Sequence, residues 1–181
     1  RGREDRGDVR HARDGRTRAE VSDVAEILPM TEADLEAKAR LSVRCWHETY
    51  EGLVPQAWLD ENITYGRMLA RQRGIGWERV LLAWDRGVPV GFASWEDEAR
   101  AWAGRRGVSE VSSIYLLRSH QGRGMGRALM EAALERCAHK SVALLVLAGN
   151  DRAIGFYEHL GFSLTGRSVA DEPLTELEML R

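Results

Sequence analysis

The pattern of apolar and polar residues divides the chain into short strands and amphipathic helices. Apolar runs rich in β-branched or aromatic side chains, bounded by Gly, Pro or charged residues, predict strands. The predicted strands are residues 24–28, 79–84, 88–95, 108–117, 143–148, 163–167 and 173–180. An Asp-Arg-Gly turn joins the second and third as a hairpin. The run at 143–148 has no polar residue, which is typical of a strand buried on both faces of a sheet.

Apolar residues at helical spacing predict helices between these strands. The predicted helices run from Thr31 to about Tyr50, over residues 55–74, from a glycine-rich segment at 121–127 to about Ala138, and from Asn150 to Gly161. A Thr-Glu-Ala-Asp capping box opens the first helix, and Pro55 lies near the first turn of the second. The order β-α-α-β-β-β-α-β-α-β-β predicts an α/β fold in which helices cover a mixed sheet.

The length and the charge of the chain indicate its domain organisation and the partners to expect. The chain has 181 residues, which suits a single domain. Residues 1–20 mix both charge signs with glycine and offer little to bury, so we expect them to be disordered and the domain to span 21–181. The net charge is −2. Because a general nucleic-acid binder needs a basic surplus, no nucleic-acid partner is expected.

Cysteine spacing and hydropathy exclude other classes. Cys45 and Cys137 each lie in an apolar helical pattern, which favours buried free thiols over a metal site or a disulfide framework. No apolar stretch reaches the ~18–20 residues of a membrane span. Residues 1–20 lack the apolar core of a secretory signal. We therefore expect a cytoplasmic protein with no metal and no membrane partner.

The segment at 121–127 joins a strand to a helix and is rich in glycine and arginine. A Walker loop would end in Gly-Lys-Ser/Thr, whereas Gly126 is followed by Arg127 and Ala128. A dinucleotide fingerprint needs Gly-x-Gly-x-x-Gly, which the segment lacks. A Gln-x-x-Gly-x-Gly turn fits, because backbone N–H groups and the dipole at a helix N-terminus attract a pyrophosphate. A flexible loop with a helix cap stays open as the alternative.

Two segments, IYLLRSHQGRGMGRALM at 114–130 and GNDRAIGFYEHLGF at 149–162, resemble the cofactor turn and the following helix of the GCN5-related N-acetyltransferase (GNAT) superfamily. The resemblance extends from about Val24 to the C-terminus, and Arg118 departs from it because relatives often have Pro there. It implies a mostly antiparallel central sheet flanked by helices, and acetyl-CoA as co-substrate. The cofactor-binding residues that it implies are Ile114, Leu116, Gln121, Gly122, Arg123, Gly124, Met125, Gly126, Arg127, Asn150 and Tyr157.

Glu110 is the residue to which the resemblance assigns the role of general base. Strand alternation predicts that it shares a face with Ser112, Ile114 and Leu116. An acceptor amine with a pKa near ~10.4 must lose a proton before it attacks a thioester, and a carboxylate accepts that proton directly or through a water. A solvated carboxylate at the start of a strand is the alternative.

Tyr157 lies seven residues after Asn150, where the family has a tyrosine beside the thiol. Its phenol would donate a proton or a hydrogen bond to the departing thiolate, and the alternative is a core tyrosine. Asn150 is implied to contact the pantetheine arm, or it serves only as a helix cap. The backbone of Ile114 and Leu116 would pair with the pantetheine amides as an added strand does.

Two segments are candidates for the acceptor side. The first comprises Trp46, His47, Glu48 and Tyr50, which fall on helices that wall this site in relatives; for Trp46 the alternative is a packed helix face. The second is the acidic cluster at 96–98, which would attract a cationic amine. A solvated connector is the alternative for this cluster.

These observations predict an N-acetyltransferase that moves the acetyl group of acetyl-CoA to a primary amine of a small molecule. Direct attack in a ternary complex is expected, since neither cysteine lies near the site motifs. A protein N-terminal or lysine acetyltransferase and a non-catalytic acyl-CoA-binding module are the alternatives. Many relatives form homodimers, which is an analogy only.

Overall fold

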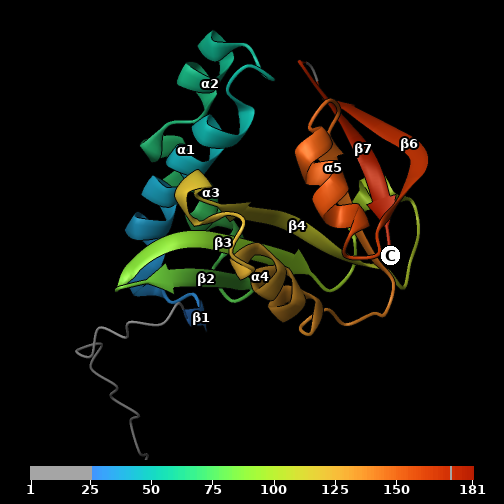
Figure 1. The fold of residues 1–181 in the computed structure, drawn as a ribbon, viewed down its shortest axis with the longest axis horizontal. Helices are drawn as coiled ribbons and strands as arrows, with labels where there is room; N and C mark the ends of the chain where they lie inside the picture. The colour runs from blue at the N-terminus through green and yellow to red at the C-terminus, as the bar shows by residue number, and fades with distance from the viewer. Residues whose placement is uncertain (1–25, 172) are drawn as a thin grey trace, which may run out of the picture.

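A seven-stranded sheet forms the centre of the computed structural model, which describes residues 26–171 and 173–181. The segment at 1–20 that we expect to be disordered lies outside these residues, as does the start of the predicted strand at 24–28. The strands are β1 (Glu26–Pro29), β2 (Val80–Asp85), β3 (Val88–Glu96), β4 (Ser109–Leu116), β5 (Val142–Leu147), β6 (Ser163–Asp171) and β7 (Leu174–Leu180). Their order across the sheet is β1-β2-β3-β4-β5-β7-β6 (Figure 1).

The sheet is mostly antiparallel, as expected. Among the described strands, the neighbours β4 and β5 pair in parallel and every other pair is antiparallel. The predicted hairpin is confirmed as β2 and β3. Its turn residues Arg86 and Gly87 have φ angles of 47° and 74°. Positive φ at both positions is typical of the type I′ turn, whose twist matches that of the two strands.

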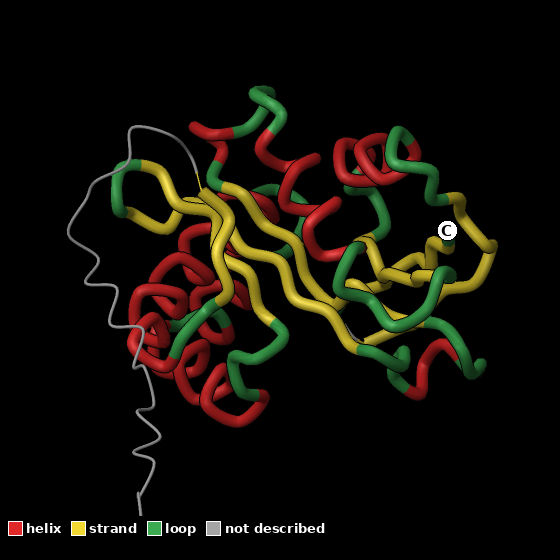
Figure 2. The backbone as a smooth tube through the Cα atoms, turned by 90° about the horizontal axis from the view of Figure 1, so that it is seen from below, coloured by secondary structure: helices red, strands yellow, loops and turns green. Residues whose placement is uncertain are grey.

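Helices cover both sides of the sheet (Figure 2). The α-helices are α1 (Leu35–Tyr50), α2 (Gln56–Asn62), α3 (Tyr65–Ile75), α4 (Met125–Leu134) and α5 (Asp151–Glu158). Helices α1 and α3 pack against each other, α4 packs on β2–β4, and α5 lies beside β7 (Figure 1). Within the described part of the chain, none of the helices has the length and apolar character that crossing a membrane requires.

Two predicted helices differ from the structure. The single helix expected over 55–74 is two helices, because Thr64 adopts an extended conformation and its side chain accepts a hydrogen bond from the N–H of Arg67. Thr at this position caps a new helix instead of continuing the old one. Helix α4 ends at Leu134 and not near Ala138. Its last turn tightens, with the N–H of Cys137 donating to the carbonyl of Leu134.

Three apolar clusters in the described part of the chain hold the sheet and the helices together, and the smallest joins Leu59 of α2 to Leu147 of β5. The first joins α1 and α4 to β2–β4, and Leu81, Leu82 and Leu129 in it are completely buried. The second joins α5 to β5 and β7 through residues such as Phe162 and Met179. At about 25 cal/mol for each Å² of apolar surface removed from water, clusters of this kind supply most of the stabilisation of a fold.

The sheet opens between β4 and β5. These two strands pair only at Ser109 with Val142 and at Glu110 with Ala143. Beyond those pairs, β4 continues to Leu116 while β5 continues to Leu147. The facing backbone edges of both strands are thus left free of strand pairing in the described structure, and the sheet has a gap where most sheets have a ladder.

Candidate active site

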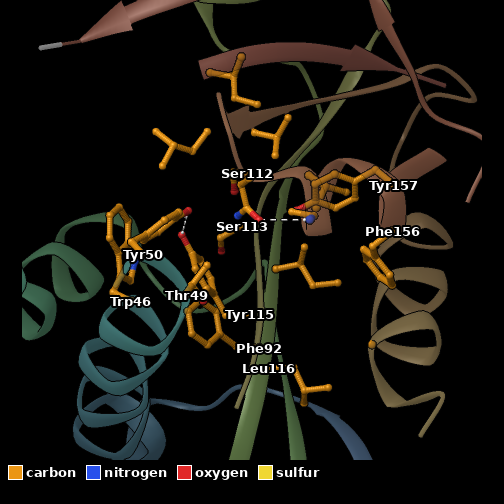
Figure 3. A pocket seen from close by; sticks show the side chains of 18 of the residues that line it. Trp46, Thr49, Tyr50, Phe92, Ser112, Ser113, Tyr115, Leu116, Phe156 and Tyr157 are labelled. Carbon is orange, nitrogen blue, oxygen red and sulfur yellow. Dashed lines mark hydrogen bonds between the residues drawn. The ribbon is translucent and has the colours of Figure 1, made fainter. Parts of the chain in front are cut away.

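A cavity of about 1180 Å³ lies at this gap. Residues 111–116 of β4 and 145–147 of β5 line it, and α1, α3 and α5 add side chains from either side. In Figure 3, Trp46, Thr49 and Tyr50 lie on one side of β4, and Phe156 and Tyr157 lie on the other. The cavity therefore passes from one side of the sheet to the other through the opening between the strands.

The glycine-rich turn forms part of the cavity wall. Gly122 and Gly124 have φ angles of 75° and 82°, which side chains rarely adopt. Gly124 is the N-cap of α4, and no protein atom lies within 4 Å of the position that a Cβ on it would take. Gln121 fixes the turn by donating its side-chain N–H to the carbonyl of Leu116 at 2.8 Å. The N-terminus of α4 thus opens onto free space that suits an anion.

Most of the cofactor residues predicted from the sequence lie around this cavity. Those that line it are Ile114, Leu116, Gln121, Gly122, Gly124, Gly126, Arg127, Asn150 and Tyr157. Arg123 is exposed, and Met125 packs on the first apolar cluster instead. Asn150 caps α5, accepting a hydrogen bond from the N–H of Ala153 at 3.2 Å. Asn150 also lines the cavity, so this cap is compatible with the predicted contact to the pantetheine arm.

A β-bulge in β4 changes which side chains share a face. Ser94 of β3 pairs with Ser113, but the next residue, Trp95, pairs with Val111, so Ser112 is the extra residue. The hydroxyl of Ser94 contacts the hydroxyls of both Ser112 and Ser113. Because of this bulge, simple alternation fails along the strand.

The prediction that Glu110 shares a face of β4 with Ile114 and Leu116 is therefore wrong. Glu110 pairs with Glu96 of β3, whereas Ile114 pairs with Ala93, and Glu96 and Ala93 lie on opposite faces because they are three residues apart. Glu110 is completely buried, and it is not among the residues that line the cavity. Its carboxylate accepts hydrogen bonds from the backbone and guanidinium of Arg100 and from the indole of Trp102. Its role as general base stays a prediction.

Tyr157 of α5 is buried at the edge of the cavity, and its role as proton donor stays a prediction. Only 8% of its surface is exposed, and it lines the cavity. Burial, with a smaller contribution from Tyr50, raises the pKa of its phenol well above the ordinary value of 10.0. The phenol therefore keeps its proton throughout the neutral range, as a donor to a departing thiolate must.

An aromatic wall faces Tyr157 across the gap. The hydroxyl groups of Tyr50 and Tyr115 lie 2.9 Å apart, and Trp46 stacks on Tyr115 with ring centroids 5.9 Å apart. Phe92 contacts Tyr115 from β3. Trp46 and Tyr50 were candidates from the sequence, whereas Tyr115 and Phe92 were not. Strand alternation alone places Tyr115 on the same face of β4 as Ser113, and the bulge places Glu110 on that face as well.

Of the two remaining candidates on α1, Glu48 and His47, only Glu48 is at the cavity. Glu48 lines the cavity. Burial alone would raise its pKa, yet hydrogen bonds from the N–H of Arg118 at 2.7 Å and from Arg44 lower the pKa overall. The backbone N–H of Arg118 is a group that Pro lacks, so this departure from the family pattern provides a contact. His47 does not line the cavity.

Of the acidic cluster at 96–98, Glu96 lines the cavity. Asp97 pairs with Arg79 at 2.7 Å, and Glu98 with His139 at 2.6 Å. The sequence did not single out Glu176 of β7, which also lines the cavity and whose charge affects Tyr50, Tyr115 and Arg100.

The sequence matches a known family and several known proteins. The sequence model of the Acetyltransferase (GNAT) family matches residues 40–162. A Pseudomonas paraeruginosa protein named L-methionine sulfoximine/L-methionine sulfone acetyltransferase is 32% identical over 126 residues, which cover 67% of this chain. The chain spans 66% of the length of that relative.

Solved structures share the fold. That of yncA, a putative acetyltransferase from Salmonella typhimurium with its cofactor acetyl-CoA, superposes with a TM-score of 0.64 at 25% identity. The match covers 87% of this chain and 93% of the Salmonella chain. The structure of PH1933 from Pyrococcus horikoshii gives a TM-score of 0.67 at 22% identity, covering 87% of this chain and 98% of the other.

Proposed function

The chain belongs to the acetyltransferase (GNAT) family, and on that premise we propose that it transfers the acetyl group of acetyl-CoA to a primary amine of a small molecule. The neutral amine attacks the thioester carbonyl carbon while both substrates are bound. The carbon–sulfur bond then breaks, and an N-acetylated product and CoA leave. The acceptor begins as an ammonium and ends as an amide, so it loses two protons, of which one goes to the CoA thiolate.

The observation that carries this proposal is the cavity at the open sheet, which reaches the N-terminus of α4. Its glycine turn would hold the pyrophosphate of acetyl-CoA on backbone N–H groups, with Arg127 adding charge. The unpaired edge of β4 at 114–116 would hold the pantetheine amides. These two features line a single cavity, so one extended ligand could reach both.

Tyr157 is the proposed proton donor to the thiolate, because it lines the cavity as a buried, protonated phenol. Glu110 is the proton acceptor proposed from the sequence. Its contacts with Arg100 and Trp102 support a structural role as well, and the two roles can be separated by mutation. The other groups that could take the proton are the carboxylates that line the cavity, namely Glu48, Glu96, Asp151 and Glu176.

A small-molecule acceptor is favoured over a peptide, because the Pseudomonas relative is named for two small molecules. The test is a free-thiol release assay with acetyl-CoA and a panel of amines, amino acids and peptides. Turnover of free amines supports the proposal. Turnover of peptides alone would move the assignment to a protein acetyltransferase, and acetyl-CoA binding without any turnover would leave a binding module.

The cofactor site is tested by Gly124→Val. A Val side chain there would enter the space proposed for the pyrophosphate, so we expect acetyl-CoA to lose its stabilising shift of the melting temperature. Gly107→Val is the matched control: its φ is 71°, it has the same empty surroundings, and it does not line the cavity. Equal shifts in both variants would contradict the assignment of the glycine turn.

A further inference from the structure

Lys38 and Arg71 are two of the cationic side chains that line the cavity. Lys38 comes from α1 and Arg71 from α3, the two helices that pack together on the aromatic side of the sheet. The ammonium of Lys38 lies 4.4 Å from the ring centroid of Phe92. Phe92 in turn contacts Tyr115, with centroids 5.1 Å apart. The two cations therefore share the cavity with the aromatic wall.

The surroundings of Lys38 disfavour its charged form. Burial and the nearby charge of Arg71 lower its pKa from 10.5 to about 8. Neither cation forms an ion pair with a residue that the structure describes. The other group whose field reaches Lys38 is the thiol of Cys45, and burial raises the pKa of that thiol to about 12, so it stays neutral near pH 7.

The carboxylates that line the cavity are Glu48, Glu96, Asp151 and Glu176, and none of them is among the groups whose charge acts on Lys38. Glu48 is held by Arg44 and Arg118. The charges of Glu96 and Glu176 act on Arg100. The cavity thus has an acidic region around Arg100 and a cationic region beside Phe92, a separation of charge that matches a molecule with an ammonium and an anion.

We propose that Lys38 and Arg71 bind an anionic group of the acceptor, so that the acceptor is an amine that also carries a carboxylate, an amino acid or a close analogue. This inference rests on the proposed function. Arg offers a planar fork of donors that fits a carboxylate, and Lys adds a point charge. Trp46, Met68 and Phe92, which also line the cavity, would contact an apolar side chain of the acceptor.

The experiment compares amino acids with apolar side chains and their carboxamides as acceptors, in wild type, Lys38→Met and Arg71→Gln. Each pair shares its side chain and differs at the carboxylate. The readout is the acid-to-amide ratio of kcat/KM, and only its change between proteins counts, because the amide also has a less basic amine. We expect the ratio to fall at least ~10-fold in each variant, the loss carried by one charge-assisted hydrogen bond.

Arg73→Gln is the matched control. Arg73 lies two residues after Arg71 on the same helix, is exposed and does not line the cavity. The acid-to-amide ratio of kcat/KM in Arg73→Gln should therefore equal that of wild type. An unchanged ratio in both Lys38→Met and Arg71→Gln would overturn the inference, and so would turnover of uncharged amines with none of amino acids. Either result leaves the acetyltransferase proposal standing.

Binding of the product tests the same subsite without turnover. Calorimetry with an N-acetyl amino acid and its amide should show tighter binding of the acid to wild type, and this preference should be lost in Lys38→Met. Equal binding of acid and amide to wild type would also overturn the inference. Absence of thiol release from every amine would reject the proposed function alone, since product binding still reports on the cationic pair.

Discussion

The replacement of Glu110 by Gln separates the structural role of this carboxylate from its proposed chemistry. Glu110 is completely buried and is bound by Arg100 and Trp102. Gln keeps the shape but loses the charge, and one of its two polar atoms is a donor facing other donors. Removing one partner of a buried ion pair costs about 3–5 kcal/mol, and the lower figure applies because half of the Arg100 side chain is exposed to water.

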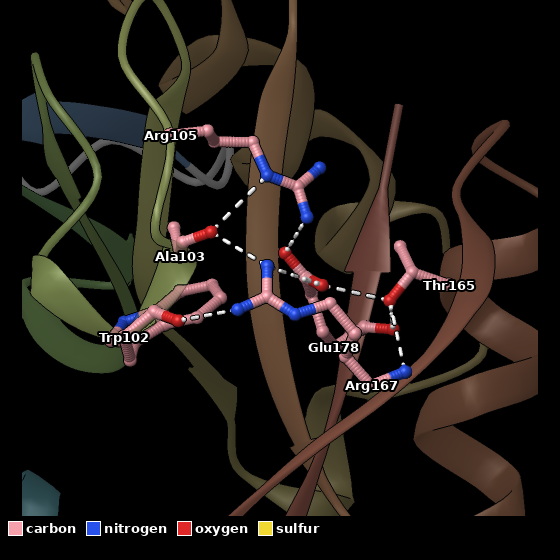
Figure 4. Close-up of polar contacts among 6 residues, drawn as sticks. All are labelled: Trp102, Ala103, Arg105, Thr165, Arg167 and Glu178. Atoms are coloured by element: carbon pink, nitrogen blue, oxygen red, sulfur yellow. Dashed lines mark hydrogen bonds and ion pairs between the residues drawn. The ribbon is translucent and has the colours of Figure 1, made fainter.

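A loss of about 3 kcal/mol lowers the melting temperature of a domain of this size by roughly 6–12 °C. Glu178 provides the matched control. It too is buried, and it accepts hydrogen bonds from Arg105 at 2.6 Å and Thr165 at 2.8 Å, with Arg167 at 3.4 Å (Figure 4). Like Glu110, it is not among the residues that line the cavity. We expect Glu178→Gln to lower the melting temperature by a similar amount.

Differential scanning calorimetry measures the stability, and thiol release measured well below both melting temperatures gives kcat. If Glu110 accepts the proton, kcat falls by roughly 10²–10⁴-fold in Glu110→Gln and stays near wild type in Glu178→Gln. A loss under threefold in both would assign Glu110 to structure alone. An unchanged melting temperature in Glu110→Gln would refute the reasoning about its buried contacts.

The remaining predictions concern Tyr157 and Lys38. Tyr157→Phe should lower kcat at least ~10-fold, with a smaller loss for thioesters of more acidic thiols, and should change the unfolding free energy by under about 1 kcal/mol. Tyr65→Phe is the control, because Tyr65 does not line the cavity. A Tyr157→Phe enzyme with the kcat of wild type would show that Tyr157 is a packing residue. Lys38 has a folded pKa of about 8, below its ordinary 10.5, so its buried charge destabilises the free protein below pH 8 and this penalty disappears as pH rises towards 10.5. Lys38→Met should therefore raise stability at pH 7 by about 1–3 kcal/mol, with the gain shrinking above pH 8, as melting curves across this range would show; a gain that is constant with pH would contradict the buried charge.

The local signals in the sequence were sufficient for most elements of the fold. The hairpin turn, the cap at Asn150 and the glycine turn before α4 depend on neighbouring residues, and the structure confirms all three as structural elements. Contacts between distant segments were harder to predict. Nothing near Ser112 indicates a bulge, because the bulge exists only in relation to Ser94 on another strand.

The same limit explains the residues that the sequence did not identify. Lys38 looks like an ordinary polar position of an amphipathic helix until Phe92, 54 residues later, is placed beneath it. Glu110 looks solvated until the connector at 97–107 brings Arg100 and Trp102 back over it. Charge and burial at these positions are set by the tertiary fold, and no periodicity in the sequence reports them.

The open edge between β4 and β5 also limits the thickness of the chain that can pair with it. An unpaired strand edge on a protein surface invites pairing with any other chain and leads to aggregation. Here the edge is recessed in a cavity, with side chains of α1 on one side and α5 on the other. A β-strand from a second protein brings side chains on both of its faces and needs far more room than one unbranched chain bearing amide groups. The recess thus leaves room beside the edge for a slender ligand and offers little room to a strand from another chain.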